Sequence, residues 1–256
     1  MRIVTLSSEY NGKSTKTGDG FLDVDNIIDV LMCHAPDVVV AAGCSIKNQK
    51  HLKKLGDALQ YLNWNGIIFV EVKDFYNQKS DFNHCLFAWV RDYGWRELGS
   101  QYFATMKDAE STFKGENDFE KNLKQRVVEF RGRRFGALIC GEINALKGRA
   151  NVIAQTEMVD NWFEELDVIV NPTHDRMRND GTLNAKRSWI SKNKKVYVSA
   201  SNWNVLKNQH REAFGIHTIF HDCTKINFNL PEKNYEKMEV RIFDLDDTKI
   251  SSSCDG

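Results

Sequence analysis

The sequence predicts a mixed α/β protein with one domain, in which helices pack against a mainly parallel or mixed sheet. Short runs of Val and Ile without polar alternation are typical of strands that are covered on both faces. Amphipathic helical patterns lie between several of these runs, as expected when helices cover a sheet. No repeat, low-complexity tract or Pro/Ser-rich linker divides the 256 residues. We therefore predict one domain over residues 1–248 and a polar tail over 249–256.

The predicted elements follow one another along the whole domain. Strands are expected at "RIVTL" (2–6), "DVVVAA" (37–42), "GIIFVEV" (66–72), "CLFAWV" (85–90), "RVVEF" (126–130), "FGALIC" (135–140), "LDVIVNP" (166–172), "KVYVSAS" (195–201) and "MEVRIFDLD" (238–246). Helices are expected at 24–35, with Ile27, Ile28, Leu31 and Met32 on one side, at 48–63 and at 151–167, because apolar residues recur there with the helical period. The polar segments 73–84, 107–122 and 173–188 are expected to be loops that shape a pocket.

Composition excludes several classes of function. Thirty-five basic and thirty-five acidic residues cancel, which removes the electrostatic argument for nucleic-acid or membrane-surface partners. No apolar run approaches the roughly 18 residues of a membrane span. The short apolar start is not typical of a signal peptide, so we expect a cytoplasmic protein whose six cysteines are reduced. Their spacing matches no zinc-ligand set, and no metal or cofactor is predicted.

The stretch "RRFGALICGEINAL" (133–146) places Cys140 at the end of a predicted buried strand, with Gly141 immediately after it. A core cysteine before a turn is one interpretation, and an exposed nucleophile is the other. In the second interpretation, the amide after the cysteine can donate to a developing oxyanion. A free thiol has a pKa of about 8.5, so a nucleophilic Cys140 needs a neighbouring base or cation.

Taken in order, the segments resemble the nitrilase superfamily, the carbon–nitrogen hydrolases. The similar segments are "MRIVTL", "APDVVVAAG", "DFNHCLFAWVRDYG", "GALICGEI", "LDVIVNPTHD", "KNKKVYVSASNW" and "MEVRIFDLD", which together extend from residue 1 to about 246. The resemblance implies a four-layer α-β-β-α sandwich that assembles as a homodimer or a higher homo-oligomer. It also implies a Glu-Lys-Cys triad that cleaves a small amide or nitrile through a thioester, without a cofactor.

The triad carries over only in part. Cys140 matches the nucleophile, and Lys107 is the candidate lysine, with Lys114 as its competitor. Gly43 stands where the catalytic glutamate is expected, and a glycine cannot accept a proton. The base must then come from elsewhere, and we prefer Glu71 to Glu9 because an acid within an apolar strand needs a partner or a function. The alternative is a catalytically impaired pseudoenzyme that uses the fold to bind a ligand or a protein.

Five further residues are candidates for supporting or substrate-binding roles. Gly141 and Glu142 adjoin the candidate nucleophile, and Glu142 resembles the acidic residue that the family has at this place. Glu116 resembles the extra carboxylate that many members carry between the lysine and the cysteine. His174 and Arg176 follow a predicted strand, and they either bind a polar group of the substrate or lie in a solvated turn.

Overall fold

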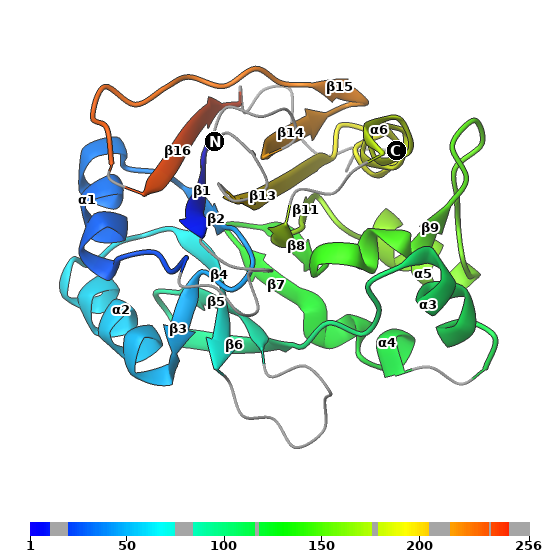
Figure 1. Ribbon diagram of the computed structural model, residues 1–256, viewed down its shortest axis with the longest axis horizontal. Helices are drawn as coiled ribbons and strands as arrows, with labels where there is room; N and C mark the ends of the chain where they lie inside the picture. Colours follow the sequence, from blue (N-terminus) through cyan, green and yellow to red (C-terminus); the bar gives the residue numbers. More distant parts are fainter. Residues whose placement is uncertain are drawn as a thin grey trace.

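The computed structural model describes residues 1–10, 20–74, 84–115, 118–175, 179–204, 216–235 and 237–245. These residues form two sheets, joined where the ends of β1 and β13 pair, that lie between two layers of helices (Figure 1). The predicted tail at 249–256 lies outside the described residues, as do Glu116 and Arg176.

The first sheet has the strand order β6-β5-β4-β2-β1-β16. Strands β1, β2 and β4 are parallel, whereas β5, β6 and β16 are antiparallel to their neighbours, and the short β3 pairs with β4. The bounds are β1 Arg2–Tyr10, β2 Val38–Ala41, β3 Ile46–Asn48, β4 Ile67–Asp74, β5 Cys85–Val90, β6 Gly94–Gly99 and β16 Met238–Asp244.

The second sheet has the order β7-β8-β11-β13-β14-β15, with β8, β11 and β13 parallel. Its strands are β7 Val127–Phe130, β8 Arg133–Ala137, β11 Val168–Val170, β13 Val196–Asn204, β14 His217–His221 and β15 Thr224–Lys225. Strand β12 (Thr173–Asp175) also pairs with β13, and β9 (Leu146–Lys147) pairs with β10 (Ile153–Ala154). The ends of β1 and β13 pair in parallel at Glu9 and Trp203, so the carboxyl ends of the parallel strands of both sheets meet.

The helices begin where side chains cap them. Asp23, Asn48, Thr105 and Thr156 each accept a backbone N–H of the first turn, which is the ordinary N-cap interaction. The α-helices are α1 Val24–His34, α2 Gln49–Tyr61, α3 Met106–Thr112, α4 Asp118–Lys121, α5 Glu157–Glu164 and α6 Asp180–Ile190, and two 3₁₀ helices are η1 Leu123–Arg126 and η2 Cys140–Ala145.

Three hydrophobic clusters define the four layers. One lies between α1, α2 and the first sheet, one between the two sheets, and one between the second sheet and α3, α5 and α6. Strand β2 shows how the sequence encodes this arrangement, because Val38 and Val40 pack between the sheets while Val39 and Ala41 pack under the helices. Both faces of the strand are buried, so an uninterrupted Val run is required. The predicted α-β-β-α sandwich is confirmed.

Several predicted elements need correction. The helix predicted at 151–167 is shorter, because residues 153–154 form β10 and Thr156 caps α5. The segments expected as loops at 107–122 and 173–188 contain most of α3, all of α4 and part of α6. Met32 was expected on the apolar side of its helix but is 68% exposed.

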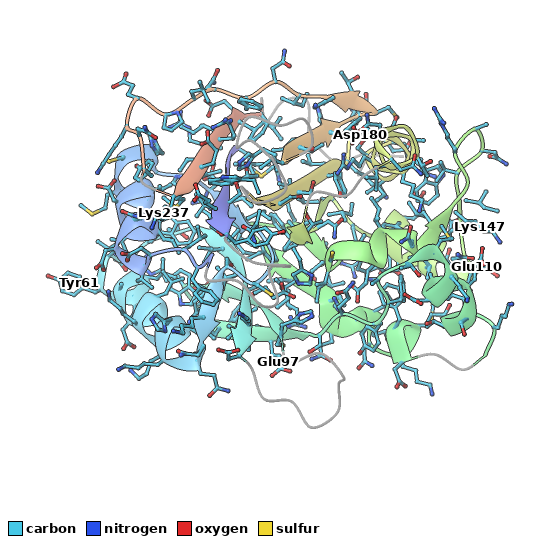
Figure 2. All side chains as sticks on the ribbon, viewed as in Figure 1. Tyr61, Glu97, Glu110, Lys147, Asp180 and Lys237 are labelled. Carbon is cyan, nitrogen blue, oxygen red and sulfur yellow. The ribbon has the colours of Figure 1, made fainter. Side chains whose placement is uncertain are left out.

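The surface carries charged and a few large apolar side chains. Figure 2 shows three side chains that project outward: Tyr61, at the end of α2, and Glu110 and Lys147, at the opposite end of the molecule. Tyr61 is 90% exposed. Among the helices of the described segments, none is long and apolar enough to cross a membrane.

Candidate active site

Cys140 lies on a sharp turn just beyond β8. The amide of Leu138 donates to the carbonyl of Val170, and the amide of Cys140 donates to that of Pro172 at 2.7 Å, so parallel pairing extends past the strand. The chain then enters η2 with a φ of 47° at Cys140, a left-handed conformation that costs a non-glycine residue energy. The thiol is therefore presented by a turn at the sheet edge, and the strand predicted to end at 140 ends at Ala137 instead.

Side chains from neighbouring strands hold this turn in place. Asn171 Nδ2 donates to the Cys140 carbonyl at 3.2 Å, and Asn171 Oδ1 accepts the hydroxyl of Tyr197 at 2.9 Å. Asn171 directly follows β11, which pairs with β8, and Tyr197 lies in β13 on the other side of β11, so the second sheet fixes the backbone of Cys140.

Gly141 is required by a close approach of two backbones. A Cβ built at Gly141 would lie 1.9 Å from the carbonyl oxygen of Ala104 and 2.5 Å from its carbon. A backbone contact cannot be relieved by a side-chain rotation, so the glycine lets the 100–105 segment pack against the turn.

Gly141→Ala is expected to lower the free energy of unfolding by about 1–3 kcal/mol, the usual cost of overpacking. This corresponds to a Tm lower by roughly 2–12 °C for a chain of this size. Thermal unfolding checks it, with Gly115→Ala as the matched control because a Cβ there meets no atom within 4 Å. A Gly141→Ala protein that unfolds with the wild type would contradict the packing argument.

The carboxylate of Glu142 is engaged in structural contacts. Its carboxylate is fully buried and accepts two N–H groups of Arg126, at 3.0 and 3.1 Å, and the amides of Tyr102 and Ile139 at 2.7 and 2.8 Å. Burial raises the pKa of Glu142, against the opposing charge of Arg126. With its oxygens occupied in this way, Glu142 braces the turn.

Glu71 is at the centre of a buried polar cluster. Along β4, Ile67 and Phe69 face the space between the sheets, so Glu71, two positions further, faces it as well. Its Oε2 accepts His174 Nε2 at 2.7 Å and the Cys44 amide at 2.6 Å, and its Oε1 accepts His84 Nδ1 at 2.5 Å. The carboxylate is fully buried and satisfied by three donors.

His174 connects this carboxylate to the thiol. It follows β11 and belongs to β12, at the same sheet edge as Cys140. Burial lowers the pKa of His174, but the charge of Glu71, followed by Cys140 and Cys44, outweighs it and raises that pKa well above the ordinary value. Cys140 adjoins this histidine along the paired strand ends, because its amide donates to the carbonyl of Pro172, two residues before His174, at 2.7 Å.

The electrostatics of Glu71 and Cys44 complement those of His174. Burial raises the pKa of Glu71, but the two histidines, through charge and hydrogen bonds, lower it well below its usual range. Burial, followed by the charge of Glu71, raises the pKa of the Cys44 thiol. Glu71 is accordingly a carboxylate and Cys44 a neutral thiol, which favours Cys140 over Cys44 as the reactive cysteine.

The structure does not bring the predicted lysines to this cluster. Lys107 is exposed in the first turn of α3, where Asp108 is its charged neighbour, and Lys114 is exposed after the same helix. Among the described residues, neither forms a hydrogen bond or an ion pair with Cys140, Glu71 or His174. The predictions for Glu116 and Arg176 fall outside the described residues.

The donor atoms of Cys44, Glu71 and His174 lie within 4.8 Å of one another, a spacing that can hold a cation. In the arrangement described, however, both oxygens of Glu71 accept N–H groups. That geometry is one of hydrogen bonding rather than of metal ligation, and we assign no metal here.

Sequence reasoning missed Cys44 and His84 as neighbours of the site, and it gave His174 the role of binding substrate. One signal was present in the sequence. Cys140 ends one predicted strand and His174 follows another by two residues, and the carboxyl ends of parallel strands meet at one edge. His84 has no comparable signal, because it precedes an antiparallel strand.

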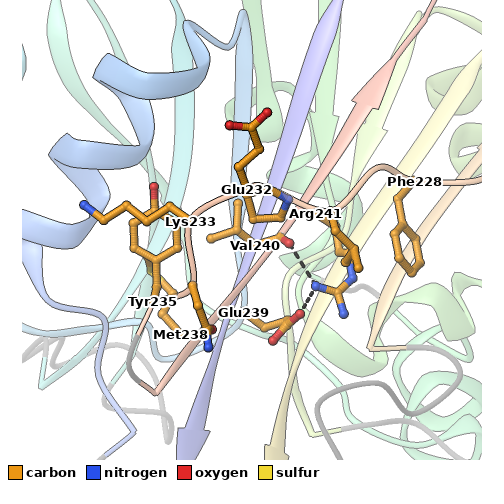
Figure 3. A pocket seen from close by; sticks show the side chains of 11 residues that line it. Phe228, Glu232, Lys233, Tyr235, Met238, Glu239, Val240 and Arg241 are labelled. Carbon is orange, nitrogen blue, oxygen red and sulfur yellow. Dashed lines mark hydrogen bonds and ion pairs between the residues drawn. The ribbon is translucent and has the colours of Figure 1, made fainter.

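A separate cavity of about 520 Å³ lies beside β16 (Figure 3). Phe228, Tyr235 and Met238 contribute apolar walls, and Arg241 forms contacts with Glu239 and the Val240 carbonyl. Cys140, Glu71 and His174 do not line it, so this cavity is distinct from the candidate site.

Solved structures that this chain resembles in fold include amidases and a CN-hydrolase superfamily protein. An amidase from Nesterenkonia sp. superposes with a TM-score of 0.54 at 10% identity, covering 98% of this chain and 92% of that one. A CN-hydrolase superfamily protein from Xanthomonas campestris, with an arsenic adduct in its active site, gives 0.55 at 10% identity over 95% and 90%. A variant of the amidase from Nesterenkonia sp. AN1 carries the acetamide moiety of fluoroacetamide on its active-site cysteine and gives 0.55 at 11% identity over 98% and 92%.

No family model matches the sequence, and no curated protein matches it either. The similarity therefore resides in the fold, over nearly the whole length of both chains. The protein has the fold of the nitrilase superfamily, the carbon–nitrogen hydrolases, as the order of the sequence segments predicted.

Proposed function

We propose that this protein is a cysteine-dependent carbon–nitrogen hydrolase that cleaves a small amide or nitrile through a thioester at Cys140. The observation that carries the proposal is the strained turn at Cys140, which lies at the sheet edge beside a buried histidine–carboxylate pair. Strain of this kind is held by surrounding structure and clusters at reactive sites. The adduct on the cysteine of an amidase with the same fold supports it.

In the proposed reaction on an amide, the Cys140 sulfur attacks the carbonyl carbon and forms a C–S bond. The carbonyl electron pair moves to oxygen, where the Gly141 amide is a candidate donor to the oxyanion. The electron pair returns, the C–N bond breaks, and the leaving amine takes a proton from the group that first received the thiol proton. Water then attacks the thioester, releasing a carboxylic acid and the free thiol. The homodimer and the small-molecule substrate expected from the resemblance remain predictions.

The alternative is a pseudoenzyme that binds a ligand with the same fold. Gly43 in the place of the usual acid and the exposed position of Lys107 favour it. The buried pair of Glu71 and His174 favours the hydrolase, because an unused ionic pair in the interior is costly to maintain.

Active-site labelling tests the proposal. Wild-type protein treated with 2-fluoroacetamide is expected to gain one acetamide group by intact-protein mass spectrometry, and Cys140→Ala to gain none. Cys223→Ala is the matched control, because this thiol is exposed, and it should label like the wild type. Release of ammonia from a panel of small amides and nitriles should fall to background in Cys140→Ala only.

Two results would decide against the proposal. Equal labelling of wild type and Cys140→Ala would exclude Cys140 as the nucleophile. A wild type that labels at Cys140 but hydrolyses no member of the panel would favour the pseudoenzyme.

A further inference from the structure

The space next to Gly43 is filled by His174. A Cβ built at Gly43 would lie 2.5 Å from His174 Cδ2, 2.9 Å from the His174 amide nitrogen and 2.9 Å from Glu71 Oε2. Any side chain at position 43 would therefore start inside the volume that the imidazole and the carboxylate occupy. The resemblance assigns the family's acid to this position, so the imidazole stands where that acid would begin.

The backbone around Gly43 is fixed from two sides. Its amide donates to the Thr173 carbonyl at 2.9 Å, and its carbonyl accepts Asn202 Nδ2 at 2.7 Å. Asn202 is itself oriented by the Ser8 amide, which donates to its Oδ1 at 2.9 Å. Because Thr173 precedes His174, the pairing of Gly43 with Thr173 holds the imidazole beside Gly43.

The partners of Glu71 anchor it as an acceptor. The Cys44 amide, His84 and His174 donate to its two oxygens. The rings of His84 and His174 pack edge to face, with their centroids 4.7 Å apart. A carboxylate held by three donors is poorly placed to carry protons but well placed to orient an imidazole.

We propose that His174 is the general base and acid for Cys140, and that Glu71 is the positioning residue that orients His174. This Cys140–His174–Glu71 relay takes the place of the missing acid at position 43. Its catalytic consequence rests on the proposed hydrolase function, whereas its effect on the reactivity of the thiol does not.

The proton transfers follow from the hydrogen bonds. His174 Nε2 donates to Glu71, which leaves Nδ1 of the neutral ring to accept a proton. The thiol proton moves from Cys140 Sγ to Nδ1, giving a thiolate and an imidazolium. When the C–N bond breaks, this proton passes from Nδ1 to the leaving nitrogen. In the second half, the same nitrogen takes a proton from the attacking water and returns it to sulfur as the C–S bond breaks.

The titratable groups that face His174 come from four segments. Glu71 from β4 and Cys140 from η2 are joined by Cys44 after β2 and His84 before β5. Of these, Glu71 favours the imidazolium most strongly, and a thiolate at Cys140 adds to it. In the relay, the proton that leaves Cys140 is held by the imidazole, which the charge of Glu71 stabilises as an imidazolium.

The pH dependence of alkylation by iodoacetamide at Cys140, followed by peptide mass spectrometry, tests the relay without a substrate. The wild-type rate is expected to change little between pH 8 and 6. In His174→Ala and His174→Gln it should fall roughly 100-fold over this range, as for a free cysteine with a pKa of about 8.5. Glu71→Gln should give a profile between these two, a change in shape that loss of a purely structural contact would not cause.

His34→Gln, on the far end of α1, is the matched control and should keep the wild-type profile. Added chelator should leave every profile unchanged. Where turnover is measurable, His174→Gln should lower kcat about 10²–10⁴-fold, the usual contribution of a positioned acid–base group.

Folded His174→Ala and His174→Gln proteins whose Cys140 alkylates with the wild-type profile would overturn the relay. Flat wild-type alkylation together with no hydrolysis of any amide or nitrile would support the relay and reject the proposed function, so the two can fail separately. Folding of each variant is checked by thermal unfolding.

Discussion

Arg126→Ala is expected to lower the free energy of unfolding by about 3–5 kcal/mol, because it leaves a buried carboxylate without its counter-ion. Arg126 and Glu142 are both fully buried and are joined by two hydrogen bonds at 3.0 and 3.1 Å. Arg126 also donates to the Ser100 carbonyl at 2.6 Å. Its removal therefore takes hydrogen bonds from both the Glu142 carboxylate and the Ser100 carbonyl. Chemical denaturation of the two proteins measures the difference.

Two further variants compare the buried ion pair with an exposed one and with an apolar replacement. Lys53→Ala removes the solvent-exposed pair with Asp57 and should change stability by less than about 1 kcal/mol. Replacing both buried partners, as Arg126→Met with Glu142→Leu, should recover part of the loss, because no unpaired charge remains. An Arg126→Ala protein within about 1 kcal/mol of the wild type would show that water reaches Glu142.

The sequence was informative wherever a single element carried the signal. Apolar runs predicted β2, β4, β5, β8 and β11, and in β2, β4 and β11 they are rich in Val and Ile because burial on both faces favours apolar residues without alternation. The order of these runs predicted the layered fold. It also exposed Gly43 as a position that departs from the resemblance, and Glu71 as an acid that needed a partner.

The missed helices lack an apolar period of their own. In α6, Lys186 and Arg187 are buried together with Leu183 and Ile190, which breaks the hydrophobic pattern that predicts a helix. Helix α3 buries only Ala109, but its start is marked by the capping box of Thr105 and Asp108. That local signal was readable in the sequence.

The site could not be assembled from the sequence because its members meet only in the tertiary structure. Glu71 and His174 are 103 residues apart and come from different sheets. Their contact depends on the junction where Gly43 pairs with Thr173. Glycine at position 43 looked like the loss of a base, whereas its physical effect is to leave room for an imidazole.

Gly43→Ala is expected to reduce kcat about 100-fold, because its Cβ would start 2.5 Å from the His174 ring and 2.9 Å from the His174 amide nitrogen. The backbone there cannot yield easily, so the ring must move by roughly 1 Å, and a misplacement of that size commonly costs about 10²-fold in rate. Steady-state kinetics on the best substrate of the panel measures the change, and KM should move much less than kcat. Gly115→Ala, where an added Cβ meets nothing within 4 Å, is the control.

The double variant Gly43→Glu with His174→Ala tests whether residues 43 and 174 compete for one space. Removing the imidazole relieves the shortest of the three contacts that a Cβ at position 43 would make, the one at 2.5 Å. The double variant should therefore be more active than His174→Ala alone, whereas Gly43→Glu by itself should be the least active. Glu71 then becomes a like-charged neighbour of the new carboxylate, which raises the pKa of one of the two acids. The double variant should therefore also respond to Glu71→Gln in the opposite sense to the wild type, gaining rate where the wild type loses it. If the double variant lost as much as Gly43→Glu and His174→Ala together, positions 43 and 174 would not share one space, and this explanation of the glycine at position 43 would have to be abandoned.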